Sequence, residues 1–189
     1  YIQRGVSMLI PPELMGAHIG PERSHTTGRR HDLAFRGATA LFGHLGIEWN
    51  LLDLDDAELE RLGEVVALHR RFRPLLHGGD IARFDTGPDA IAHGVYARDR
   101  SEALVSFARV ATSSSLTPDR LRLPDLDAAT RYRVEPIPLP GGHAGPARRQ
   151  PDWFVNGVAL TGRQLAVVGL QPPAMHPDTA ILLHLRASR

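Results

Sequence analysis

The sequence contains neither cysteine nor lysine, and each absence excludes whole classes of functional site. Without cysteine, the 189 residues cannot form disulfides, thiolate zinc sites, iron–sulfur clusters or a cysteine nucleophile. Without lysine, Schiff-base catalysis and Walker-type phosphate loops are excluded as well. Apolar runs extend for only a few residues, far short of the roughly 20 that cross a bilayer, so we expect no membrane-spanning segment.

The charged residues are balanced, with 22 basic side chains, all of them arginine, against 21 acidic ones. A net charge of +1 spread along the chain gives no reason to expect nucleic acid or a membrane surface as a partner. One stretch concentrates arginines but also contains Glu22 and Asp32, so we interpret it as a solvated, partly ion-paired surface. Its arginines are Arg23, Arg29, Arg30 and Arg36.

The first 79 residues alternate between apolar segments and amphipathic ones. Residues 6–10 predict a buried strand that two prolines stop, and residues 46–52 predict a second strand. Strands joined by helices are typical of a parallel α/β sheet. Two parallel strands leave edges and helix faces without partners, so this region is expected to be part of something larger.

Helix boundaries in this region have clear local signals. Asp32 is a candidate N-cap for the helix that follows it, and Asp55 with Glu58 three residues later predicts a capping box. We expect this second, longer helix to be ended by Pro74 and the glycines at 78–79.

The remaining residues change character and predict an antiparallel β-sandwich of about seven short strands separated by turns. Residues 98–101 are a credible hairpin turn within it. The predicted strands are residues 81–84, 91–97, 103–111, 120–123, 132–137, 164–168 and 181–185.

No motif places a complete catalytic or metal site. His18, His25 and His31 are close in sequence, but their spacing matches no ligand pair, so we expect no metal and no cofactor. A glycosidase needs two carboxyl groups that face each other across a bond. The acids near the predicted strand ends are Glu13, Glu22, Asp32 and Glu48, and helix capping already accounts for Asp32.

A recognisable pattern runs through the first fifty residues, with PPELMGAHIG at 11–20, HTTGR at 25–29 and FRG at 35–37. It continues through residues 41–51, 71–76, 79–80, 101–105 and 160–170. Together these segments resemble the late-barrel segment and the C-terminal domain of glycoside hydrolase family 36 α-galactosidases, also called melibiases.

The resemblance implies a fold of two parts. Residues 1–79 would be the last two βα units of a (β/α)₈ TIM barrel, and residues 80–189 would be the antiparallel β-sandwich domain that follows it in the family. Barrel enzymes bind substrate at the C-terminal ends of their strands. The segment 11–18 would then border the sugar pocket, with Met15, Gly16 and His18 in its wall.

The resemblance carries over no catalytic residue. The family's nucleophile is the Asp of a Lys-x-Asp motif on the fourth barrel strand, and its acid/base is the Asp of a Ser-Asp motif on the sixth. Neither motif occurs here. The chain is therefore expected to be an inactive C-terminal portion of a bacterial, cytoplasmic, retaining α-galactosidase that acts on sugars such as melibiose or raffinose.

Two other hypotheses stay open. The chain could be a non-catalytic carbohydrate-binding or interaction module, for which an exposed aromatic side chain such as Trp153 would supply a sugar platform. The second hypothesis is a complete small α/β enzyme, which the absence of catalytic motifs argues against.

Because the chain begins without Met or a signal pattern, we interpret its start as a cut end. The unpaired strands predict a homo-oligomer or association with the missing part of the barrel.

Overall fold

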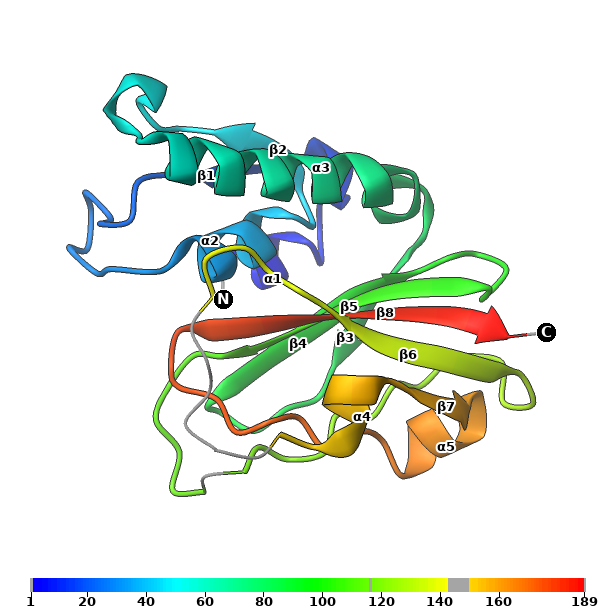
Figure 1. The fold of residues 1–189 in the computed structure, drawn as a ribbon. Helices are drawn as coiled ribbons and strands as arrows, with labels where there is room; N and C mark the ends of the chain where they lie inside the picture. Colours follow the sequence, from blue (N-terminus) through cyan, green and yellow to red (C-terminus); the bar gives the residue numbers. More distant parts are fainter. Residues whose placement is uncertain (1, 116, 143–149, 189) are drawn as a thin grey trace.

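The computed structural model describes residues 2–115, 117–142 and 150–188. A small parallel sheet and two helices lie over one face of a larger antiparallel sheet (Figure 1). The N-terminal elements are α1 (Ile2–Val6), η1 (Pro12–Leu14), β1 (Gly16–Ile19), α2 (Leu33–Ala40), β2 (His44–Ile47), η2 (Leu51–Asp53) and α3 (Asp56–Gly78). The C-terminal elements are β3 (Asp80–Phe84), β4 (Ala90–Tyr96), β5 (Glu102–Arg109), β6 (Arg131–Ile137), α4 (Asp152–Asn156), β7 (Val158–Thr161), α5 (Gly162–Val167) and β8 (Thr179–Ser188). Within the described ranges, no helix has the length and apolar character needed to span a bilayer.

The parallel pair β1 and β2 confirms the α/β character of the N-terminal region but not its predicted first strand. Residues 6–10 close a helical turn, and Met8 and Leu9 are 61% and 89% exposed. The strand begins only after the two prolines have formed η1, because proline cannot donate to a ladder. The second strand also lies earlier than predicted, since the Asn50 side chain accepts from Leu52 N and starts η2 there.

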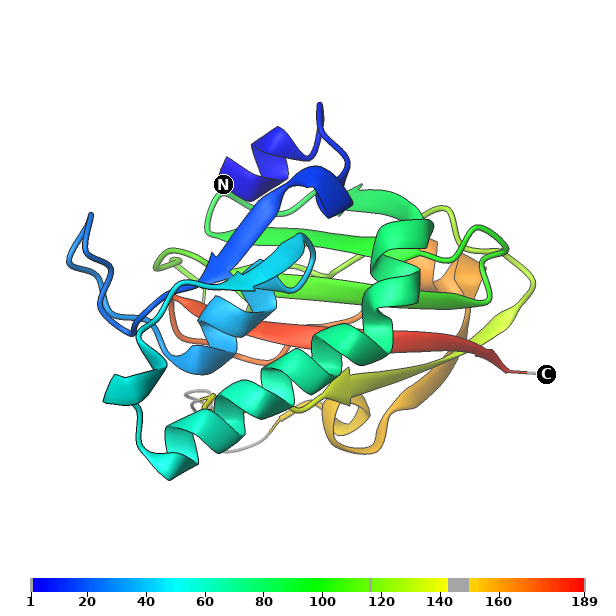
Figure 2. The same ribbon diagram turned by 90° about the horizontal axis from the view of Figure 1, so that it is seen from above.

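The predicted helix starts are confirmed. Asp32 accepts a hydrogen bond from Phe35 N at 2.7 Å, and Asp55 and Glu58 form the reciprocal capping box. Of the predicted end signals, the glycines are confirmed, since α3 ends at Gly78 with Gly79 as its C-cap, but Pro74 does not stop the helix. Figure 2 shows α3 changing direction in its C-terminal part, as expected where a proline removes one helical hydrogen bond.

The strands of the larger sheet run in the order β3-β4-β5-β8-β6-β7, and all neighbours are antiparallel. Five predicted strands are confirmed as β3, β4, β5, β6 and β8. Residues 164–168 are instead largely helical, because Thr161 and Gln164 form a capping box that starts α5. Residues 120–123 contribute only a bridge between Leu121 and Leu170. The described strands after residue 79 therefore form one six-stranded sheet, whereas a sandwich of two packed sheets was predicted for this region.

Side chains alternate along each strand, so each strand sends side chains to both faces of the sheet. Both faces contribute to a hydrophobic cluster. Val95, Leu104 and Leu182 pack against Phe72 and Leu76 of α3. The opposite face packs against α5 and irregular segments. Its core includes Tyr96, Val105, Leu183, Leu121, Leu165 and Leu170. The sheet thus shares a hydrophobic core with α2 and α3, and these two helices pack against the parallel pair in a separate cluster.

Candidate functional site

The loops that follow the C-terminal ends of β1 and β2 form the candidate site. β1 ends at Ile19 and β2 at Ile47, and Glu48 N donates to Ile19 O at 3.0 Å, which joins the two strand ends. In parallel barrels, active sites are built from the loops that follow the C-terminal ends of the strands. The candidate site therefore consists of residues 20–32, between β1 and α2, and residues 48–50, after β2.

The predicted pocket residues lie at both ends of β1, some at its N-terminal end and one near its C-terminal end. Met15 follows η1 and Gly16 is the first residue of β1, so both lie at the N-terminal end of this strand. The prediction that the segment 11–18 follows a strand is wrong, because most of it precedes β1. His18 lies one residue before the C-terminal end of the strand. Contact between these three residues and a substrate stays a prediction.

His18 lies on the exposed face of the pair, directly opposite Gly46 in the register. Its Nδ1 is 3.7 Å from Glu48 Oε2, so the two side chains form a polar pair beside the strand ends. A Cβ at position 46 would collide with the His18 ring. Glycine at position 46 therefore lets the imidazole lie against β2.

Arg36 of α2 connects the two loops. Its Nε donates to the carbonyl oxygens of His31 and Asp32 at 3.1 and 3.2 Å, and its Nη1 donates to Gly20 O. The guanidinium also lies 4.7 Å from the centre of the Trp49 ring, a cation–π distance. Burial lowers the pKa of Arg36 from its usual value, while the nearby acids oppose that shift.

The loop of residues 20–32 is held by polar contacts. None of residues 21–32, all within the described part of the chain, is buried. Arg23 and Arg30 form an antiparallel bridge, His31 N donates to Glu22 O at 3.0 Å, and the tip turns at Gly28 with φ of 69°. Arg29 also donates to the carboxylate of Asp178, which lies directly before β8.

Three of the four candidate acids have structural partners. Asp32 caps α2, Glu22 lies 3.6 Å from Arg30, and Glu48 pairs with His18. Glu13 is exposed in η1. No group of three or more metal-ligating side chains occurs among the residues that the structure describes. The arrangement thus holds the loop of residues 20–32 beside the strand ends, and the acids there serve as a helix cap and in ion pairs.

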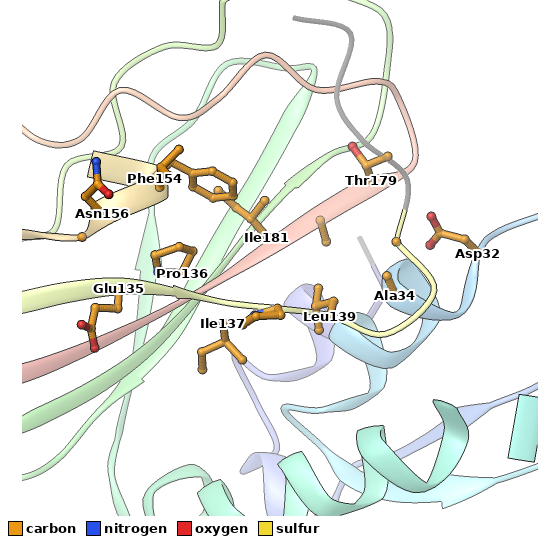
Figure 3. A pocket seen from close by; sticks show the side chains of 15 residues that line it. Asp32, Ala34, Glu135, Pro136, Ile137, Leu139, Phe154, Asn156, Thr179 and Ile181 are labelled. Carbon is orange, nitrogen blue, oxygen red and sulfur yellow. The ribbon is translucent and has the colours of Figure 1, made fainter. Parts of the chain in front are cut away.

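A groove of about 680 Å³ lies on the larger sheet, between the start of α2, β6, α4 and the start of β8. Figure 3 shows Phe154 and Ile181 on its floor, with Asn156 and Thr179 toward its ends. Trp153, the proposed sugar platform, packs against the core, and its Nε1 donates to Gln171 O at 2.9 Å. This placement argues against the carbohydrate-binding module, because the indole is partly buried against the core and its N–H already has a partner.

Sequence reasoning missed Arg36 and Asp178. Arg36 was grouped with the solvated arginines, although its spacing from Asp32 puts it on the first turns of α2, where it faces both loops. Asp178 had no sequence signal, since its partner Arg29 is 149 residues away.

The chain matches known proteins along nearly its whole length. Residues 1–79 match the family model described as Melibiase, and residues 90–185 match the glycosyl hydrolase family 36 C-terminal domain. An α-galactosidase of Escherichia coli is 40% identical over 192 residues, which cover 97% of this chain and 27% of that protein. The α-galactosidase AgaA of Geobacillus stearothermophilus is 34% identical over 144 residues, or 75% of this chain and 20% of that protein.

Solved structures show the same relationship. A structure of AgaA from Geobacillus stearothermophilus in complex with 1-deoxygalactonojirimycin superposes with a TM-score of 0.82 and 27% identity, over 99% of this chain and 24% of that one. A raffinose complex of AgaA gives the same values. The chain spans about a quarter of the length of these relatives. By sequence and by fold, the chain belongs to glycoside hydrolase family 36.

Proposed function

We propose that this chain is the C-terminal part of a retaining α-galactosidase that releases terminal α-galactosyl groups from raffinose-type oligosaccharides. The observation that carries the proposal is the 40% identity to the Escherichia coli α-galactosidase across 97% of this chain. Structures of AgaA variants with raffinose and with stachyose support the substrate class. A cytoplasmic location stays a prediction.

In this proposal, residues 1–79 are the last two βα units of the barrel and residues 80–189 are its C-terminal domain. The parallel pairing of β1 with β2, with α2 and α3 packed on one face, supports the first assignment. Each of these strands has only one partner among the described strands. In the whole barrel, their free edges would pair with the neighbouring strands, and their exposed face would point into the barrel interior.

The chemistry of the proposed enzyme requires groups outside this chain. A retaining glycosidase uses two carboxyl groups about 5–5.5 Å apart, one as nucleophile and one as acid and then base. The carboxylates at the candidate site are used for capping or for ion pairs. This part of the protein therefore contributes loops at the rim of the pocket and the sheet that supports them.

The partner that this proposal assigns to the chain is the remainder of its own barrel. Exposed apolar side chains lie near the strand pair, including Leu14, Ile47, Leu51 and Leu52. Together with the unpaired strand edges, they favour burial against further strands and helices. Homo-oligomerisation of the whole enzyme is a further prediction.

The test compares the full-length protein with this chain alone. We expect the full-length protein to release galactose from raffinose and this chain to release none, because the two carboxylates lie upstream. Sucrose and a β-galactoside serve as control substrates for the full-length protein. Hydrolysis by this chain alone, or a full-length protein without activity on α-galactosides, would contradict the proposal.

A further inference from the structure

One contact joins the candidate site to the C-terminal domain. Nη2 of Arg29 donates to both carboxylate oxygens of Asp178, at 2.8 and 2.9 Å. The Nε2 of His31 lies 3.6 Å from Oδ2 of the same carboxylate. Asp178 thus faces two side chains from the loop between β1 and α2, and it comes from the turn that enters β8.

The backbone at Asp178 is held in an uncommon conformation. Its φ of 58° is in the left-handed region, which aspartate tolerates better than most residues with a Cβ. In the same turn, Thr179 Oγ1 donates to His176 O at 2.6 Å. Non-glycine residues remain in this region when surrounding contacts determine them, and such positions cluster at functional sites.

The loop depends on polar contacts at its two ends. Arg36 holds the ends near β1 and α2 through Gly20 O and His31 O. Arg29 and His31 lie in the part of the loop that follows the turn at Gly28. The bridge between Arg23 and Arg30 connects this part to the part that precedes the turn. No residue of 21–32 is fully buried, and the ring of His31, which packs against Phe35 at 5.1 Å between ring centres, is the aromatic contact at the end of the loop, so polar contacts hold most of it. The contacts of Asp178 with Arg29 and His31 link this returning part of the loop to the segment that enters β8.

We propose that Asp178 is a positioning residue for catalysis, which holds the loop between β1 and α2 at the rim of the substrate pocket through Arg29 and His31. This inference rests on the proposed function, because the loops after the C-terminal ends of barrel strands build the active site. It gives the C-terminal domain a defined part in catalysis besides support of the barrel.

The exposure of the pair distinguishes positioning from general stabilisation. The side chains of Arg29 and Asp178 are 57% and 30% exposed, and exposed ion pairs add little to global stability. Loss of the pair should therefore change the order of the loop and the kinetics more than it changes thermal unfolding. A misplaced loop costs substrate positioning even when the fold is intact.

The test uses Asp178→Asn in the full-length protein, because asparagine also tolerates the left-handed region. We expect kcat/KM for raffinose to fall about three- to tenfold, with kcat falling as well as KM rising, and the melting temperature to change little. Arg29→Ala should give a similar loss. The double variant should lose less than the sum of the two single losses, because both substitutions act on the contact between Arg29 and Asp178. Faster hydrogen exchange of the amides of residues 22–31 should accompany the loss.

Asp80→Asn is the matched control. Asp80 Oδ2 lies 2.5 Å from Arg100 Nη1 in another partly exposed ion pair, which joins β3 to the β4–β5 hairpin. This variant should leave kcat/KM unchanged. The inference is overturned if Asp178→Asn has wild-type kinetics in an active enzyme, or if the losses of Asp178→Asn and Arg29→Ala are additive. A wild-type protein with no α-galactosidase activity would instead overturn the proposed function, and the catalytic role of Asp178 with it.

Discussion

The guanidinium of Arg36 lies over the indole ring of Trp49, so one side chain of α2 connects the loops that follow β1 and β2. The same guanidinium donates to three backbone oxygens, those of Gly20, His31 and Asp32. A planar group with several donors and an aromatic contact cannot be replaced by an ammonium of equal charge.

Arg36→Lys should therefore destabilise the full-length protein although it preserves the charge. We expect a loss of about 1–3 kcal/mol in the free energy of unfolding, because hydrogen bonds from a half-buried charged group and the cation–π contact are lost. Thermal denaturation measures this loss. Arg70→Lys, on an exposed position of α3, is the control and should have no effect. Equal stability of the two variants would contradict the role assigned to Arg36.

Gly46→Ala should destabilise the strand pair through a specific clash. The added Cβ would meet the His18 ring, so the ring must leave its place against β2. Because the ring is about half exposed and can move to another rotamer, we expect a cost of about 0.5–1.5 kcal/mol. In a His18→Ala background, the same substitution should cost much less, and denaturant unfolding of the four variants measures the coupling.

Gly63→Ala is the control for Gly46→Ala, because it should stabilise the protein. Gly63 lies inside α3, and a Cβ there meets no atom within 4 Å. Alanine should raise stability by about 0.5–1 kcal/mol, because glycine lowers helix stability. If Gly46→Ala behaved like Gly63→Ala, the proposed contact with His18 would be wrong.

Acid should destabilise the protein through His93. Burial, with smaller contributions from Arg4 and Arg83, lowers the pKa of His93 from 6.5 to about 4. The unfolded chain therefore binds a proton between these values that the folded chain does not, so stability is present above pH 6.5 and is lost as pH falls toward about 4.

We expect this histidine to remove about 1–2 kcal/mol of stability between about pH 7 and about pH 5. His93→Gln should reduce that loss, as measured by denaturant unfolding at both pH values. Some acid sensitivity should remain, because burial also lowers the pKa of His184, although its hydrogen bond with Glu102 opposes the shift. An unchanged pH dependence in His93→Gln would contradict this prediction.

The chain produced alone should self-associate at micromolar concentrations. Leu52 is 93% exposed in η2, shortly after β2, whose free edge is proposed to pair with further barrel strands. Leu52→Glu should weaken the association measured by sedimentation. Val167→Glu is the control, since Val167 is 65% exposed on α5, far along the chain from the parallel pair. A monomeric chain, or equal effects of both variants, would contradict this prediction.

Several elements could be predicted because their causes are local. The caps at Asp32 and Asp55 each use partners three residues away, and five strands of the larger sheet show apolar segments bounded by turns. The errors arose where a short apolar segment has two possible structures. Residues 6–10 and 164–168 are both apolar, yet neither is a strand, because a helical turn and the Thr161 capping box determine their conformations.

The sequence by itself determined the family, the absence of cysteine and lysine chemistry, and the helix starts, because these depend on residue identity and on contacts over a few positions. Only the tertiary structure decided which end of β1 each candidate residue occupies, and therefore that Met15 and Gly16 lie away from the loops. It alone brought Asp178 to Arg29 and Arg36 to Trp49. Such contacts join distant segments, so they form only when strand pairing and core packing have placed the backbones that carry them.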